Sequence, residues 1–154
     1  RAAQILKDMG TPCLIHQPRY NLFDRWVEED HLFDTLEEAG MGSIIFSPLA
    51  QGLLTDRYLQ GLPDDSRAVR DARYFNSSQI TEDKLAKVKA LNAIAQRRGQ
   101  SLAQMAIAWI LIDTRVTSVL IGASKPEQIE DNVAALKNLD FSKEELQVIR
   151  EIIT

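Results

Sequence analysis

Residues 118–132, SVLIGASKPEQIEDN, combine an apolar run with a polar helix start. The stretch begins as an apolar run typical of a buried strand, passes through a glycine and a serine, and becomes a polar helix. The core needs only an apolar stripe at helical spacing, for which we expect Ile129, Val133 and Leu136. At about 100° per residue, a separate polar arc of about 80° holds Gln128, Asp131 and Asn132.

The rest of the chain repeats this alternation of strand and helix. The predicted elements are the end of a helix over 1–10, strands over 13–17, 42–50 and 118–122, helices over 28–40, 82–99 and 102–112, a helix to about 137, and a closing helix. The predicted capping boxes pair Ser101 with Gln104, Ser124 with Glu127, and Ser142 with Glu145. The polar connection over 51–80 is too long for an ordinary loop, so we expect a functional segment or a lid.

Strands that alternate with helices pair in parallel, so the predicted fold class is α/β with a parallel sheet. Three apolar strands alone form a thin sheet with two open edges, although parallel strands are normally buried between neighbours. Arg1 already lies in a helix, which indicates a piece of something larger. A (β/α)8 barrel needs about 250 residues, so the pattern favours the second half of a TIM barrel. A complete small doubly wound domain is the alternative.

Composition excludes several classes of partner. Of the 154 residues, 45% are hydrophobic, which is typical of an ordered soluble domain, and no apolar run approaches the ~20 residues of a membrane span. The net charge of −4, from 18 basic and 22 acidic residues, argues against nucleic acid. Cys13 is the single cysteine, so we predict a small buried thiol and a cytoplasmic location.

Local motifs for other chemistries are absent or misplaced. The run GMGSII over 40–45 precedes a strand, whereas a dinucleotide fingerprint must follow one. His16 and His31 lie fifteen residues apart and only one cysteine is present, so no metal site is predicted. The acidic run over 28–30 is interpreted as a solvated helix start, where negative charge complements the helix dipole.

Each predicted strand ends in residues that a plain core does not require: Gln17, then Phe-Ser-Pro over 46–48, then Gly-Ala-Ser over 122–124. Ligands of α/β sheets and barrels bind at the carboxyl ends of the strands, so we predict a site there. Gly122 allows a ligand to approach the backbone, and the helix start that follows suits a phosphate. The polar arc beside it could hydrogen-bond an adenine or be a solvated face. If Gln17 faces inward, His16 faces the helices, where we expect a hydrogen-bonded structural histidine.

Three stretches, IHQPRYNLF, IIFSPLAQGLLTDRY and TSVLIGASKPEQIEDNV, resemble the sixth, seventh and eighth strand-loop units of the aldo-keto reductases. The resemblance covers essentially the whole chain. It implies that residues 1–154 are the C-terminal half of a (β/α)8 barrel, starting within the helix before strand 6, with 51–80 on the cofactor side. It also implies binding of NADPH without a Rossmann fold, and reduction of aldehydes or ketones, such as glyceraldehyde 3-phosphate or methylglyoxal, to alcohols.

The resemblance assigns a cofactor role to fifteen residues. Gln17 would bind the nicotinamide carboxamide, and Phe46 would stack on the ring. The pyrophosphate would run along Ser47, Pro48, Leu49, Ala50 and Gly52. The long connection would contact the cofactor through Ser66 and Arg67. The adenosine part would be held by Gly122, Ser124, Gln128, Asp131 and Asn132. Many family members have arginine where Gln128 stands, so the 2′-phosphate of NADP is assigned to Lys125 or Arg67.

The catalytic aspartate, tyrosine, lysine and histidine of the family belong to the first half of the barrel, so no catalytic residue is assigned in this chain. Tyr20 and His16 lack the partners that a general acid needs, and we predict that the chain alone is inactive. The implied partners are the missing N-terminal half and a small carbonyl substrate, and a homo-oligomer is left open. Two other functions stay open: a non-catalytic nicotinamide-nucleotide-binding module that regulates a partner, as in the channel β-subunit relatives, and a structural fragment without ligand.

Overall fold

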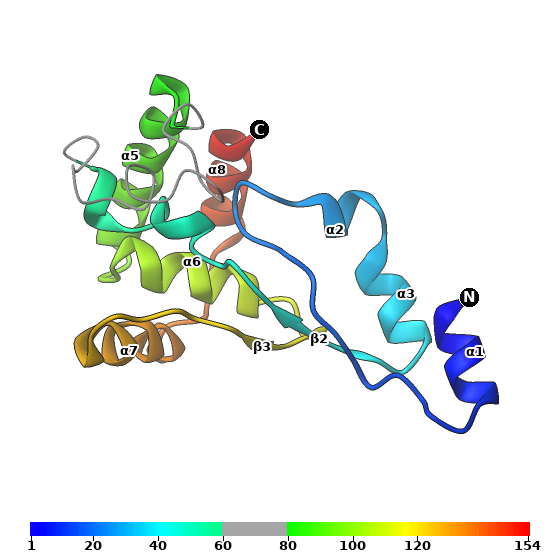
Figure 1. The fold of residues 1–154 in the computed structure, drawn as a ribbon. Coiled ribbons are helices and arrows are strands. Elements are labelled where there is room, and N and C mark those ends of the chain that lie inside the picture. The colour runs from blue at the N-terminus through cyan, green and yellow to red at the C-terminus, as the bar shows by residue number, and fades with distance from the viewer. Residues whose placement is uncertain (60–79) are drawn as a thin grey trace.

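The sheet of this protein has three parallel strands, seen in a computed structural model that describes residues 1–59 and 80–154 (Figure 1). The strands are β1 (Ile15–His16), β2 (Gly42–Ile45) and β3 (Val116–Val119), hydrogen-bonded in that order. The α/β class with a parallel sheet is therefore confirmed. The helices are α1 (Ala2–Asp8), α2 (Trp26–Glu29), α3 (Leu32–Glu38), α5 (Glu82–Arg97), α6 (Leu102–Leu111), α7 (Pro126–Val133) and α8 (Lys143–Ile153), with short 3-10 turns η1 (Ala50–Gly52), η2 (Asp56–Tyr58) and η4 (Ala134–Lys137).

Strand β3 begins two residues and ends three residues earlier than the sequence predicts, and it contains a bulge. Ser43 pairs with Val116 and Ile44 pairs with Ser118, so Thr117 is left out of the ladder. Gly42 makes room for this bulge, because a Cβ atom at Gly42 would lie 2.7 Å from the Thr117 hydroxyl oxygen. The predicted strands over 13–17 and 42–50 are likewise shorter in the structure, ending at His16 and Ile45.

The core is built around α6, which lies between the sheet on one side and α5 and α8 on the other (Figure 1). Eight of its ten residues are buried, as expected for a helix that is apolar on all sides. The capping boxes of Ser101 with Gln104 and of Ser142 with Glu145 are confirmed at the starts of α6 and α8. These boxes satisfy N–H groups that have no partner within a helix, and so they set where each helix begins.

The single helix predicted over 28–40 is wrong, because the chain breaks into α2 and α3 at His31. His31 has a left-handed backbone with φ of 51°. Glu28 in α2 bonds to Tyr20 and Arg25, whereas Asp34 in α3 pairs with Arg115 at the start of β3. The solvated helix start predicted over 28–30 is also wrong for Glu28, which is half-buried and paired.

The predicted core stripe of α7 is wrong, because its apolar side chains are exposed. Residues Ile129, Val133 and Leu136 are 50%, 55% and 58% exposed, while Asn132 and Ala135 are buried. The small side chain of Ala135 lets this segment pack closely, so the buried side of the segment differs from the one that hydrophobicity predicts. Cys13 is half-buried rather than buried, and the predicted burial of β1 is wrong because both of its residues are exposed.

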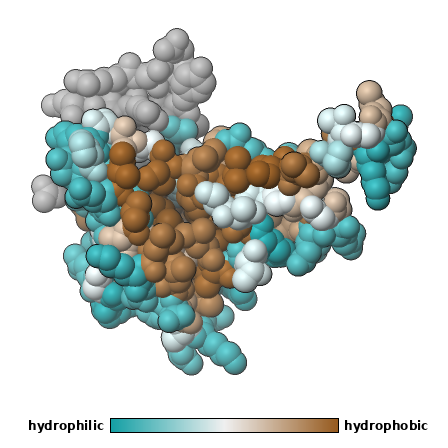
Figure 2. Space-filling model, turned by 90° about the horizontal axis from the view of Figure 1, so that it is seen from below, coloured by the Kyte–Doolittle hydropathy of each residue, from teal (hydrophilic) through white to brown (hydrophobic). Residues whose placement is uncertain are grey.

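Apolar side chains gather on the face of the molecule seen from below (Figure 2). The alternation of β2 buries Ser43 and Ile45 and leaves Gly42 and Ile44 partly exposed. The exposed large apolar side chains of the three strands, their flanks, α7 and η4 are Leu14, Ile15, Phe46, Leu120, Ile129, Val133 and Leu136. We refer to this set as the apolar face. Large exposed apolar surfaces mark places where another element or molecule packs.

Candidate functional site

The carboxyl ends of the three strands lie side by side, as parallel pairing requires. The Phe46 N–H donates to the carbonyl of Pro18 at 3.1 Å, and the Leu120 N–H donates to the carbonyl of Ile45 at 2.8 Å. An isolated bridge also joins Arg19 to Phe46. The structure therefore brings together the chain that follows β1, β2 and β3 at one end of the sheet (Figure 1). We call this end of the sheet the strand-end edge.

Gln17 and Phe46 are the exposed groups at the first two strand ends. The Gln17 side chain is exposed and has no hydrogen-bond partner in the described part of the chain. Phe46 is 41% exposed, which leaves its ring accessible to a ligand. The structural hydrogen bond expected for His16 is wrong, since this side chain is exposed and bonds to no described residue.

The segment after Phe46 has a strained backbone. Ser47, Ala50 and Gln51 have φ values of 57°, 48° and 61°, in the left-handed region that residues other than glycine rarely adopt. Gly52 follows with φ of 94°. Such conformations cluster at ligand-binding sites, and alternating turns of this kind point main-chain N–H groups into anion-binding concavities. The N–H groups of Ser47 and Leu49 find no acceptor among residues 1–59 and 80–154.

Two residues hold the predicted cofactor loop in place, and neither was predicted. The Asn21 amide is buried and donates to the Ser47 carbonyl at 3.0 Å. The Gln51 amide donates to the Ser47 hydroxyl at 3.2 Å. In the sequence, Asn21 is one polar residue of a turn, and no local pattern indicates a contact with Ser47 twenty-six positions away. Pro48, Leu49 and Ala50 lie on this same segment and are buried or half-buried.

At the third strand end, the capping box predicted for Ser124 and Glu127 is wrong. The N-cap of α7 is Lys125, and no side chain caps the helix. Instead, the side-chain oxygen Oε1 of Gln128 accepts two hydrogen bonds from Ser124. The Ser124 main-chain N–H donates at 2.8 Å, and the Ser124 hydroxyl donates at 3.2 Å. Gly122 is exposed, and a Cβ atom added there would meet nothing within 4 Å, so its backbone is open to approach.

The polar arc of α7 divides into two different environments. Asp131 accepts from the Ser101 hydroxyl at 3.0 Å and the Gln104 amide at 2.6 Å, so its carboxylate ties α7 to the capping box of α6. Asn132 is only 6% exposed, and its side-chain amide bonds to no residue of the described chain. Buried amides are rarely left unpaired, so this group points to a missing partner. Lys125 is exposed at the helix start, and Ser66 and Arg67 lie outside the described residues.

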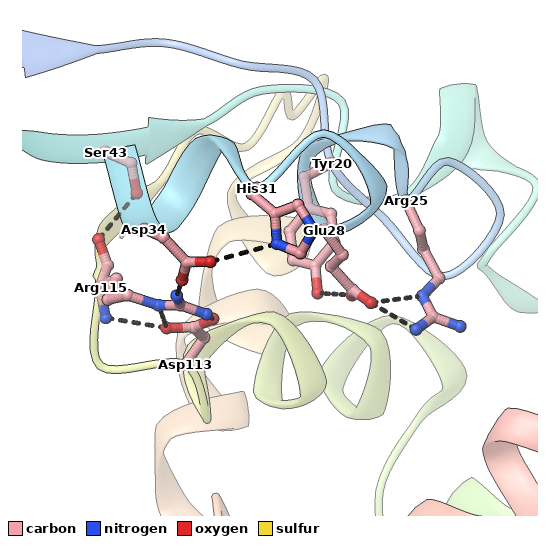
Figure 3. A network of polar contacts seen from close by, with 8 residues as sticks. All are labelled: Tyr20, Arg25, Glu28, His31, Asp34, Ser43, Asp113 and Arg115. Atoms are coloured by element: carbon pink, nitrogen blue, oxygen red, sulfur yellow. Dashed lines mark hydrogen bonds and ion pairs between the residues drawn. The ribbon is translucent and has the colours of Figure 1, made fainter. Parts of the chain in front are cut away.

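A second polar cluster lies away from the strand ends, between α2, α3 and the start of β3 (Figure 3). Glu28 accepts from Tyr20 and Arg25, and Arg115 pairs with Asp34 and Asp113. A cavity of about 370 Å³ adjoins this cluster. The charged side chains that line the cavity, apart from the exposed Arg150, are paired with opposite charges. The polar cluster therefore holds α2, α3 and the start of β3 together.

Burial and the Glu28 carboxylate raise the pKa of Tyr20 well above its usual range. The folded chain thus keeps this phenol neutral, whereas the unfolded chain ionises near its ordinary pKa of about 10. The stability linked to Tyr20 is fully present below pH ~10 and is lost as pH rises beyond it. We expect Tyr20→Phe to lower the free energy of unfolding by about 1 kcal/mol at neutral pH, and the difference from wild type to disappear toward pH ~11. Urea unfolding at both pH values measures it, and a difference that grows with pH would contradict the assignment.

No described helix combines the length and the apolar composition that a bilayer crossing requires. Residues 1–59 and 80–154 also contain no group of three histidine, cysteine or acidic side chains placed to hold a metal ion.

Comparison with known proteins identifies the family. Residues 1–154 match the sequence profile of the aldo/keto reductase family. The chain is 52% identical over 156 aligned residues to L-glyceraldehyde 3-phosphate reductase of Escherichia coli K12, a match that covers 99% of this chain and 45% of that protein. A probable voltage-gated potassium channel β subunit of Oryza sativa is 41% identical over 125 residues, covering 80% of this chain and 38% of that protein. This chain belongs to the aldo/keto reductase family.

Solved structures agree with this assignment. A glycerol dehydrogenase of Gluconobacter oxydans superposes with a TM-score of 0.75 at 25% identity, covering 97% of this chain and 45% of that one. An aldo-keto reductase of Bacillus halodurans superposes with a TM-score of 0.69 at 23% identity, covering 99% of this chain and 47% of that one, which shows the fold. The chain spans about half the length of the relatives that it matches.

Proposed function

We propose that this chain binds a reduced nicotinamide dinucleotide, NADPH, at the strand-end edge, as part of an oxidoreductase that reduces small aldehydes or ketones. The observation that carries the proposal is the buried Asn132 amide, which has no partner in the described chain. An unpaired buried amide is costly, and a bound adenosine would supply the donor and acceptor that it lacks. Aldo-keto reductases generally use such cofactors, which supports this choice of ligand.

The residues at the other two strand ends fit the rest of the cofactor. The exposed Gln17 amide, which has no partner among the described residues, suits the nicotinamide carboxamide, and the exposed Phe46 ring offers a stacking surface. The main-chain N–H groups of Ser47 and Leu49, which have no acceptor among the described residues, could donate to the pyrophosphate. When bound, a reduced nicotinamide supplies the hydride, and the protein supplies orientation and electrostatics.

A preference for NADP over NAD is assigned to Lys125. Its ammonium group is exposed at the start of α7 and is paired with no described carboxylate, so it is available to a 2′-phosphate. Gln128 is already engaged with Ser124, and amides carry no charge for a phosphate. Asp131, whose carboxylate is engaged by α6, supports the adenosine end by fixing α7 in place.

The proton for the reduced carbonyl is assigned to residues outside this chain. Tyr20 is 4% exposed, packs against Phe33 and Trp109 with ring centroids 5.3 Å apart, and donates to Glu28. A general acid must reach the carbonyl oxygen, and this phenol is directed elsewhere. We assign the apolar face (Figure 2), apart from Phe46, to contacts with the first half of the barrel, which would close the open sheet edges and bury this surface.

The substrate is proposed to be a small aldehyde, on the strength of the 52% identity to a protein named L-glyceraldehyde 3-phosphate reductase. A second candidate function is a non-catalytic nicotinamide-binding module that regulates a partner protein, which is favoured by the 41% identity to a probable potassium channel β subunit. Both functions use the same cofactor site. Turnover with the barrel completed supports the enzyme, and tight binding without turnover supports the regulatory module.

Titration with NADPH tests the site directly. We expect quenching or a spectral shift of the NADPH fluorescence on binding, and Phe46→Ala is expected to weaken binding about tenfold, because loss of an aromatic stacking surface costs about 1–2 kcal/mol. Ile112→Ala is the matched control, since Ile112 is similarly exposed, at 37%, but lies at the far end of α6. Equal affinity in Phe46→Ala and wild type, or no binding with the barrel completed, would contradict the proposal.

A further inference from the structure

The loop after β2 holds a conformation that its own sequence does not favour. Three residues other than glycine, Ser47, Ala50 and Gln51, are left-handed within a five-residue span. Each costs free energy, so the surroundings must hold them in place. Within the loop, the Ala50 N–H donates to the Ser47 carbonyl at 3.1 Å, which closes a tight turn around Pro48. The Ser47 carbonyl is therefore the group on which this turn depends.

The same carbonyl receives a second hydrogen bond from a buried side chain of the preceding strand-end loop. The Asn21 amide nitrogen donates to it at 3.0 Å, and the Asn21 amide oxygen accepts the Phe23 N–H at 3.0 Å. Asn21 is only 3% exposed. Since one end of the amide faces a carbonyl and the other faces an N–H group, its orientation is determined by its partners. Both ends of this buried group are thus satisfied.

The loop that carries Asn21 is itself held rigidly. Asn21 and Asp24 exchange main-chain hydrogen bonds of 3.1 and 3.0 Å across a tight turn. Arg19 forms an ion pair with Asp24, and the Trp26 indole N–H donates to the Arg19 carbonyl at 3.0 Å. The Asn21 side chain therefore links the turn after β1 to the strained turn after β2 through its hydrogen bond to the Ser47 carbonyl.

We propose that Asn21 is a positioning residue for cofactor binding. Its amide holds the Ser47 carbonyl, and so keeps Phe46 and the main-chain N–H groups of Ser47 and Leu49 arranged for the nicotinamide and pyrophosphate. This inference rests on the function proposed above. Asn21 is buried and does not contact the ligand. Its effect is confined to the nicotinamide half of the site, because the adenosine half is built on α7 and α6, where Asp131 and Ser101 supply separate anchors.

The test compares Asn21→Ala with wild type in the chain completed by the first half of the barrel. Asn21→Ala removes the buried hydrogen bond to the Ser47 carbonyl, so we expect it to bind NADPH about tenfold more weakly. Its affinity for 2′,5′-ADP, which lacks the nicotinamide half, should stay within about twofold of wild type. Asn92→Ala on α5 is the matched control and is expected to change neither affinity. Asn21→Asp, which keeps the acceptor for Phe23 but loses the donor to Ser47, should reproduce the selective loss.

A measurement without cofactor separates the two proposals. Hydrogen exchange of the peptide spanning residues 46–54 is expected to be about tenfold faster in Asn21→Ala, with the peptides of α7 unchanged. Failure of wild type to bind NADPH would overturn the proposed function and leave this exchange result to test the link between Asn21 and the loop. Unchanged exchange over residues 46–54, or equal losses of NADPH and 2′,5′-ADP affinity in both Asn21 variants, would overturn the positioning role.

Discussion

NADPH mixed with this chain and a small aldehyde is expected to stay unoxidised, and turnover is expected to begin when the first half of the barrel is supplied. We assign no general acid to the described residues of the strand-end edge, because the exposed His16 at the end of β1 has no described partner to position it. Gln17 and Phe46 cannot donate a proton to a developing alkoxide, and Tyr20 is buried against Glu28. General acid catalysis contributes about 10²–10⁴-fold to rate, and correct orientation of the reactants contributes further.

The experiment combines this chain with the part of E. coli L-glyceraldehyde 3-phosphate reductase that it does not match, and follows NADPH absorbance with glyceraldehyde 3-phosphate as substrate. Co-purification of the two polypeptides reports whether the apolar face is covered. The Phe46→Ala chain in the same mixture should turn over more slowly, and the Ile112→Ala chain should behave as wild type. Turnover by this chain alone would show that it contains its own proton donor.

Arg98→Ala is expected to lower the free energy of unfolding by about 2–4 kcal/mol. This is the largest loss of stability that we predict for a single substitution. The Arg98 side chain is only 3% exposed and pairs with Glu145 at 3.0 Å. It also donates to Gln100 at 2.8 Å and lies 3.6 Å from the centroid of the Phe141 ring. Removing it leaves the side-chain oxygen of the buried Gln100 without its donor. It also takes one of two donors from the Glu145 carboxylate, which keeps the Ser142 N–H, so the desolvation of both groups is less fully offset.

Two variants make this prediction specific. Arg98→Lys keeps the charge but loses the planar fork that contacts several acceptors at once, so we expect a loss intermediate between wild type and Arg98→Ala. Arg97→Ala, at the exposed neighbouring position, should change stability by no more than about 0.5 kcal/mol. Urea unfolding measures all three. A loss in Arg98→Ala no greater than that in Arg97→Ala would show that the guanidinium is not structurally required.

Features that depend on residues close in the chain could be predicted from the sequence. The capping boxes at Ser101 and Ser142 were predictable because each joins residues three positions apart. The parallel sheet followed from the alternation of strands and helices, and the strand-end edge followed from parallel pairing. The capping box at Ser124 failed because Gln128, one position beyond Glu127, took the role expected of the glutamate. The roles of the cofactor residues stay predictions.

Features that depend on distant contacts could not be predicted. The buried side of α7 is set by how Ala135 and Asn132 pack in the tertiary structure, and periodicity instead favoured Ile129 and Val133. An apolar stripe indicates that a helix face favours burial. It does not indicate which surface packs against that face. The break at His31 likewise depends on the separate anchors of Glu28 and Asp34.

The α/β class, the parallel sheet, the family and two of the helix starts follow from the amino-acid sequence, because each is encoded in spacing or in motifs along the chain. The folded chain was needed to see that Asn132 is buried without a described partner, that Asp131 bonds to Ser101 and Gln104 at the start of α6, and that Asn21 holds the strained turn at Ser47. Whether a polar group has a hydrogen-bond partner depends on its neighbours in space. The sequence alone does not distinguish a polar residue that is solvated from one that is paired, or from one that is buried and unpaired.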